Sequence, residues 1–95
     1  MSARAVRLHP DDNVATAIGD LSPGELLQLG PVHVEVIELV AFGHKVALVH
    51  IGRDQEVIKY GEVIGLAGGE ISAGCLVHVH NLESRRGRGD LRASP

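Results

Sequence analysis

Short runs of alternating apolar and polar residues recur along this chain, separated by clusters of glycine, proline, aspartate and asparagine. The clearest run is VHVEVIELV, residues 32–40, where three valines at alternate positions fall on one face of an extended chain. His33 and Glu35 fall on the other face. No window of about ten residues carries apolar side chains at the 3.6-residue period of an amphipathic helix. The pattern therefore predicts an all-β fold.

The remaining elements are short. Residues 13–18, NVATAI, mix apolar side chains with Thr16, and Asp12 or Asn13 could cap a single helical turn there. Residues 21–30 indicate a turn followed by a short strand. The other expected strands are residues 4–9, 32–40, 44–51, 56–65 and 75–82.

A weak internal repeat supports a folded-over β structure. An aliphatic residue stands three places before a turn-forming residue in Leu21-Ser-Pro-Gly24, Ile51-Gly-Arg-Asp54 and Ile71-Ser-Ala-Gly74. A strand-like run follows each of them. Three turns of this kind predict a compact β domain and not a flat meander.

Composition limits how this fold is stabilised. The chain has 95 residues, one Phe, one Tyr and no Trp, so its core must consist of thin aliphatic layers. A domain of this size commonly gains stability by burying surface against a partner, which predicts an oligomer. We expect one domain over residues 1–82 and a flexible tail over 83–95, where apolar residues are few.

Charge and cysteine content exclude several classes of protein. The net charge of −3 argues against a nucleic-acid partner, since the arginines that stand close together in the sequence are confined to the tail. Within that tail, Arg86 either reaches a carboxylate or stays solvated. Cys75 is the only cysteine and has no activating neighbour, so burial is expected for it. No signal peptide or membrane span is visible, which predicts a cytoplasmic protein without a membrane partner.

The stretch VHVHN, residues 77–81, contains the first candidate site. If one strand runs through it, His78 and His80 point to the same face, about 6.5–7 Å apart. They could bind one metal ion or one anionic group, although a metal site would need further ligands from elsewhere. The alternative is an exposed strand face with Val77 and Val79 packed inward.

Further candidates stand in turns. In GHKVAL, Gly43 permits a sharp turn before His44 and Lys45, and a histidine beside an ammonium suits a general base near neutral pH. A plain turn is the alternative. In VIKYG, Lys59 could bind a carboxylate and Tyr60 could donate its hydroxyl, or Tyr60 could be a core ring. HPDDN, residues 9–13, could bind hydroxyls or simply turn the chain.

In this order, LHPDDNVATAI, GHKVAL, EVIKYGEVIG and HVHNL closely resemble the SAF-type domain of the altronate dehydratase family. The resemblance runs from about Val6 to Asp90. It implies a β-clip fold. Members of that family remove water from sugar acids such as altronate and galactarate, and close relatives are small subunits of a lyase that eliminates sulfite from sulfolactate.

The resemblance also implies roles for individual residues. His9, Asp12, Asn13, His44, Lys45 and Tyr60 match positions that the dehydratase branches share. His44 and Lys45 are the expected catalytic residues. A histidine pair like His78 and His80 is a feature of only some branches of the family. The pair is expected to form a wall of the pocket or to ligate a metal. The expected substrate-binding residues are His9, Asp12, Asn13, Lys59, Tyr60, Asn81 and Arg86.

The implied chemistry is β-elimination, in which a base removes the weakly acidic proton α to a carboxylate. The resulting enediolate needs a divalent metal, iron or manganese, together with cationic side chains. Ninety-five residues look too few to supply all of these groups. We therefore expect the small subunit of a sugar-acid dehydratase that shares its active site with a larger subunit. The alternatives are a sulfolactate-type lyase subunit and a binding or interaction module without enzymatic activity.

Two departures from the family pattern bear on the middle turn. His50 stands where an acidic residue is frequent, and Asp54 stands where glycine is frequent. Since aspartate tolerates left-handed backbone, we expect the turn to be kept.

Overall fold

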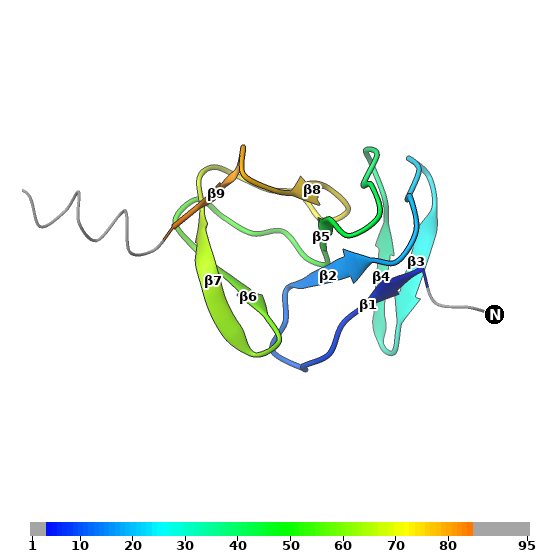
Figure 1. Cartoon of the computed structure of the whole chain (residues 1–95), viewed down its shortest axis with the longest axis horizontal. Helices are drawn as coiled ribbons and strands as arrows, with labels where there is room; N and C mark the ends of the chain where they lie inside the picture. The colour runs from blue at the N-terminus through cyan, green and yellow to red at the C-terminus, as the bar shows by residue number, and fades with distance from the viewer. Residues whose placement is uncertain (1–3, 85–95) are drawn as a thin grey trace, which may run out of the picture.

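The computed structural model describes residues 4–84, and within that range the chain forms nine short antiparallel strands and no helix (Figure 1). The all-β prediction is confirmed. The helical turn suggested for residues 13–18 is wrong, because Val14–Ala17 is a strand. The strands are β1 (Ala5–Val6), β2 (Val14–Ala17), β3 (Leu26–Leu29), β4 (Val32–Glu35), β5 (Lys45–Ala47), β6 (Glu56–Lys59), β7 (Glu62–Ala67), β8 (Leu76–Val77) and β9 (Leu82–Glu83).

A central sheet in the order β1-β2-β5-β8 separates two hydrophobic cores. Figure 1 shows the β3–β4 hairpin at one end of this sheet and the β6-β7-β9 sheet at the other. Because neighbouring residues of a strand point to opposite faces, Ala15 and Val46 belong to the core with β3–β4. Val14 and Ala47 belong to the core with β6 and β7. Both cores are aliphatic, as the composition predicts.

The predicted turns are present, and the structure adds a fourth, Val40-Ala-Phe-Gly43. In all four, the last residue has a left-handed backbone, with φ of 91°, 84°, 70° and 90° at Gly24, Gly43, Asp54 and Gly74. The next N–H donates to the carbonyl of the second turn residue, as from His44 to Ala41 at 3.0 Å. Asp54 thus keeps the turn, as expected.

The four aliphatic residues that begin these turns join them in pairs. Leu21 bridges to Val40 and Ile51 bridges to Ile71, and all four are at most 2% exposed. Residues 21–47 and 51–77 therefore follow one plan: turn, hairpin, turn, strand. The sequence hid the fourth turn because Val40 also completes the apolar run of residues 32–40.

The expected strands are shorter than the sequence pattern indicates: residues 4–9 contain only Ala5–Val6 and residues 44–51 only Lys45–Ala47. The run 32–40 is extended only to Glu35, and the run 56–65 is a hairpin turned at Tyr60 and Gly61, with φ of 56° and 77°. The run 75–82 is interrupted by a turn over residues 78–81. The predicted tail lies outside the described residues from position 85 onward, and no described segment is a helix long and apolar enough to cross a membrane.

Candidate functional site

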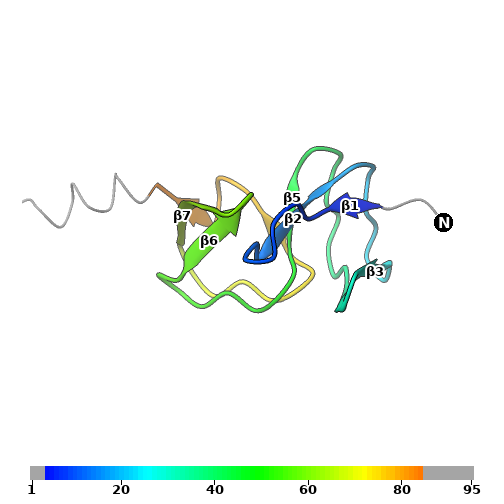
Figure 2. The same ribbon diagram turned by 90° about the horizontal axis from the view of Figure 1, so that it is seen from below.

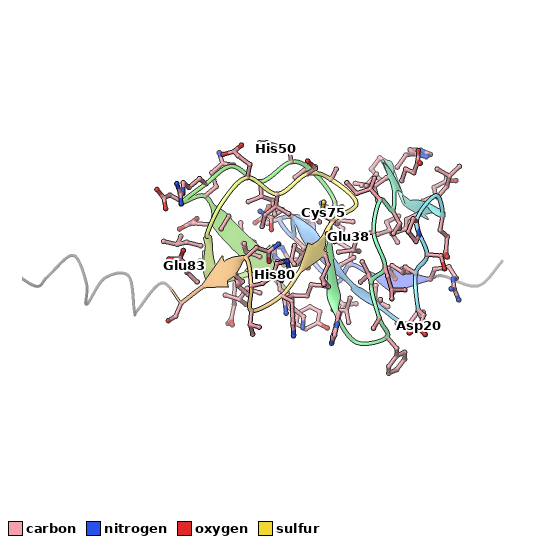
Figure 3. All side chains as sticks on the ribbon, turned by 90° about the horizontal axis from the view of Figure 1, so that it is seen from above. Asp20, Glu38, His50, Cys75, His80 and Glu83 are labelled. Atoms are coloured by element: carbon pink, nitrogen blue, oxygen red, sulfur yellow. The ribbon has the colours of Figure 1, made fainter. Side chains whose placement is uncertain are left out.

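The turn before β5, the end of β6 and the turn after β8 bring five basic residues together. The rings of His44 and His78 stack with their centroids 4.4 Å apart and their planes at 19°. In addition to burial, the charge of Lys59 lowers the pKa of Lys45, and the charges of Lys45 and His80 help to lower the pKa of His78. We call His44, Lys45, Lys59, His78 and His80 the basic cluster. Figure 3 shows His80 on the segment that joins β8 to β9.

The cluster holds positive charge that the described part of the chain does not neutralise. Burial, and secondly the charge of Lys59, lower the pKa of Lys45 below its ordinary value. Within residues 4–84, neither lysine forms an ion pair with a carboxylate. Instead, the Lys59 ammonium lies 4.9 Å from the centroid of the Tyr60 ring. An anionic group placed here would relieve the repulsion between the lysines.

His78 is suited to accept a proton. Burial, and then His44, Lys45 and His80, lower its pKa below the ordinary 6.5. Its imidazole is therefore largely neutral at pH 7, and the lone pair of its unprotonated nitrogen can accept a proton or bind a metal ion. The ring of His44 stacks against the His78 imidazole.

The strand geometry assumed for His78 and His80 is wrong. β8 ends at Val77, and the two histidines lie in the following turn, where Val79 is 80% exposed and not packed inward. Asn81 fixes this turn: its Oδ1 accepts the His78 N–H at 2.9 Å and its Nδ2 donates to the Leu76 carbonyl at 2.8 Å. The placement of both imidazoles thus depends on Asn81.

The described residues do not form a complete metal site. None of their His, Cys, Asp and Glu side chains gather in a group of three or more that could hold an ion. His44 and His78 are also poorly arranged for one metal, since imidazole lone pairs lie in the ring plane and those planes are nearly parallel. A metal at His78 and His80 would need further ligands from outside residues 4–84.

Asp12 and Asn13 attach the β1–β2 connection to the β6–β7 hairpin. The buried Asp12 carboxylate accepts the Gly61 N–H at 2.8 Å and the His9 N–H at 3.3 Å. Asn13 accepts the Ile58 N–H through Oδ1 and donates through Nδ2 to a β6 carbonyl, both at 2.8 Å. These contacts give both residues a structural role. Their binding of substrate hydroxyls, and that of His9, remains a prediction.

The hydrogen bonds to Asp12 predict an acid-dependent loss of stability. Burial opposes ionisation of Asp12, but backbone N–H groups of Gly61, Tyr60 and His9 outweigh it, so its pKa lies below the ordinary 3.8. The ionised form therefore contributes stability that is complete above this ordinary value and is lost as the pH falls through the lower folded value. We expect Asp12→Asn to cost about 1–3 kcal/mol at pH 7, since asparagine keeps one acceptor oxygen but replaces the other by an NH2 group that faces an N–H donor. Urea unfolding from pH 7 to 2.5 checks this: the difference from wild type must shrink at acid pH, and parallel curves would contradict it.

Tyr60 is not a core ring. It is 48% exposed, and its φ of 56° places it in left-handed backbone, which costs a residue other than glycine roughly 1–2 kcal/mol. The bond from Gly61 to Asp12 holds this strained turn in place beside Lys59. The ring and hydroxyl of Tyr60 are thereby presented to solvent next to the basic cluster.

Thr16 is a site neighbour that the sequence analysis passed over. It pairs directly with Lys45 in the central sheet, on the same face, and its Oγ1 is buried without a hydrogen-bond partner among residues 4–84. A polar residue within the otherwise apolar stretch VATA was the available signal.

We expect Thr16→Val to stabilise the domain by about 1 kcal/mol, because it removes a buried hydroxyl without a partner and keeps the branched shape. Thr16→Ser, which keeps the hydroxyl and loses the methyl group, should be less stable than wild type. Urea unfolding of both variants measures the effect. A destabilised T16V protein would show that the hydroxyl does have a partner.

Three other sequence candidates lie apart from the basic cluster or outside the described range. Burial, and then Glu38, raise the pKa of Cys75, so this thiol is not activated. His50 Nε2 lies 2.8 Å from Glu70 Oε1 in an exposed pair. Arg86 lies outside the described residues.

Comparison with known proteins now identifies the family. Residues 3–85 match the family model described as the altronate/galactarate dehydratase SAF domain. The chain belongs to this family. This confirms the resemblance stated from the sequence motifs.

Relatives of this SAF domain differ greatly in length. The chain is 39% identical over 79 residues to altronate dehydratase of Bacillus subtilis and 43% identical over 76 residues to that of Escherichia coli. These matches cover 83% and 80% of this chain but only 16% and 15% of the relatives. The alpha subunit of (2R)-sulfolactate sulfo-lyase from Chromohalobacter salexigens is 40% identical over 52 residues, 55% of each chain, so these two chains are about equally long.

Proposed function

We propose that this chain is the small subunit of an altronate-type sugar-acid dehydratase and supplies substrate-binding groups to an active site shared with a larger catalytic subunit. The observation that carries the proposal is the basic cluster, in which two lysines without carboxylate partners in residues 4–84 lie beside two stacked histidines. Sugar acids carry the carboxylate and hydroxyls that such groups bind. A cytoplasmic location is part of the proposal.

In this proposal, Lys45 and Lys59 bind the substrate carboxylate and stabilise the charge that grows on it when the α-proton leaves. His44 or the neutral His78 moves a proton, and Tyr60 is placed to donate to a substrate hydroxyl. Asp12, Asn13 and Asn81 hold the turns that carry these groups. The divalent iron or manganese expected for the family would obtain most of its ligands from the larger subunit.

The relatives support a division between two polypeptides. In the two altronate dehydratases, a region like this chain is joined to a much longer remainder. The sulfolactate sulfo-lyase relative is named as a subunit and has about the length of this chain, which favours a sulfo-lyase subunit as the second candidate. A sulfonate is also an anion, so the basic cluster fits either substrate class.

The test is to purify the tagged chain from its own cell with whatever larger lyase subunit accompanies it, and to assay the complex and each part separately. We expect dehydration of a sugar acid by the complex alone. Sulfite release from sulfolactate without dehydration would favour the second candidate. A chain that stays alone and inactive would contradict both and leave the binding-module alternative.

A further inference from the structure

Three turns around the basic cluster each expose one large apolar side chain. Phe42 is 69% exposed two residues before His44, Tyr60 is 48% exposed beside Lys59, and Val79 is 80% exposed between His78 and His80. We call Phe42, Tyr60 and Val79 the apolar rim. Exposed apolar side chains are ordinary one by one, but a group of them around a charged centre is typical of an interface.

The rim residues belong to one region of the surface although they come from distant parts of the sequence. Stacking of His44 on His78 brings the turns of Phe42 and Val79 together. Asn13, directly before β2, accepts the Ile58 N–H at 2.8 Å, which holds β6 and the following Tyr60 turn next to β2, the strand that pairs with β5 at Lys45. Figure 2, which views the molecule from below, shows the β6–β7 hairpin on one side of the central β2 and β5 strands. β5 follows the Phe42 turn and pairs with β8, which precedes the Val79 turn.

Polar contacts hold each of these turns in a fixed shape. The Phe42 N–H donates to Asp20 Oδ1 at 2.9 Å, and the buried Asp12 binds the Gly61 N–H after Tyr60. Asn81 closes the turn of Val79 from both sides. Turns that are already ordered lose little conformational entropy when a partner covers them.

We propose that the apolar rim is the docking surface for the larger catalytic polypeptide, which covers the basic cluster and encloses it at the interface. This inference rests on the proposed function and assigns it a surface. Aromatic and aliphatic side chains around a charged centre would exclude water there, which strengthens the interaction of the lysines with an anionic substrate.

Charge favours this partner over a second copy of the same chain. If two copies met at this surface, Lys45 and Lys59 would face the same lysines of the other copy. Like charges that face each other across an interface cost roughly several kcal/mol of binding free energy. A partner that brings carboxylates or an anionic substrate is complementary. In the altronate dehydratase relatives, the matched region is accompanied by a remainder several times its own length, which can supply such a surface.

The experiment measures the affinity of the full chain for the larger polypeptide that co-purifies with it and that mass spectrometry identifies as dehydratase-like. Phe42→Asp and Val79→Asp place a charge in the rim. Leu26→Asp is the matched control, because Leu26 is 76% exposed on the β3–β4 hairpin, which carries no residue of the basic cluster or the apolar rim. We expect the Kd from biolayer interferometry to rise about tenfold or more for each rim variant. For L26D it should change less than twofold, and circular dichroism should show that all three variants are folded.

The outcomes separate this inference from the proposed function. An active dehydratase complex whose Kd is unaffected by F42D and V79D, or is affected equally by L26D, overturns the docking surface alone. A complex weakened by the rim variants but inactive on sugar acids supports the surface and overturns the function. Recovery of no such polypeptide, or self-association of the chain that F42D abolishes, overturns the docking proposal.

Discussion

Replacing Lys45 by methionine is expected to lower kcat/KM of the proposed dehydratase complex for a sugar acid by about 100-fold or more, the usual cost of losing one charged or hydrogen-bonding group that stabilises a developing anion. Methionine keeps the length of the side chain and removes only the charge. Because burial and Lys59 already disfavour the Lys45 ammonium, the variant should be at least as resistant to urea as wild type. Loss of activity with retained stability is the expected result.

Two controls separate a role in binding from a general loss of positive charge. Lys45→Arg keeps the charge and should retain more activity than K45M. Arg53→Met removes an exposed cation from the turn before β6, outside the basic cluster, and should leave kcat/KM within about twofold, as for most surface substitutions. If R53M is as damaging as K45M, or if K45M is fully active, Lys45 has no part in the site.

Replacing Gly74 by alanine is expected to cost about 2–5 kcal/mol of the free energy of unfolding, from left-handed strain of roughly 1–2 kcal/mol and overpacking of roughly 1–3 kcal/mol. Gly74 has φ of 90°, and an added Cβ would overlap the carbonyl oxygen of Glu35 at the end of β4. The overlap cannot be relieved by a side-chain rotation, because the backbone fixes both the position of the Cβ atom and that of the Glu35 carbonyl oxygen.

Gly24 supplies the matched control, since it occupies the same place in its own turn. Its φ is 91°, yet no heavy atom lies within 4 Å of an added Cβ. Gly24→Ala should therefore cost only the strain, about 1–2 kcal/mol. Urea unfolding of the two variants measures the difference directly. Equal costs would mean that the contact between the Gly74 turn and β4 is looser than described.

The sequence predicted the fold class because its strongest signals are local. Alternating runs and turn residues depend on neighbours in the chain, and three of the four turns followed from an aliphatic residue and a turn former at fixed spacing. The ends of the strands were harder to predict from the sequence. An apolar run does not say where hydrogen bonding stops, so the break after Val77 and the hairpin at Tyr60 were missed.

Only part of the site could be derived from the sequence. The residue types of four members, His44, Lys45, Lys59 and His78, indicated a functional site. Their proximity in space depends on the register of β5 against β8 and on the position of the β6–β7 hairpin. These are long-range pairings. For the same reason Thr16 was noted only as a polar residue in an apolar run and not as a neighbour of the site, since it pairs with Lys45 across two strands.

The repeated plan of residues 21–47 and 51–77 has a consequence for how the site arises. The first copy contributes His44 and Lys45, while the second contributes Lys59 and ends at Val77, directly before His78 and His80. A chain cut in the exposed segment Val49–His50 would leave each fragment with an intact copy and an incomplete cluster. The basic cluster thus belongs to neither half by itself and forms only when the two repeated halves associate.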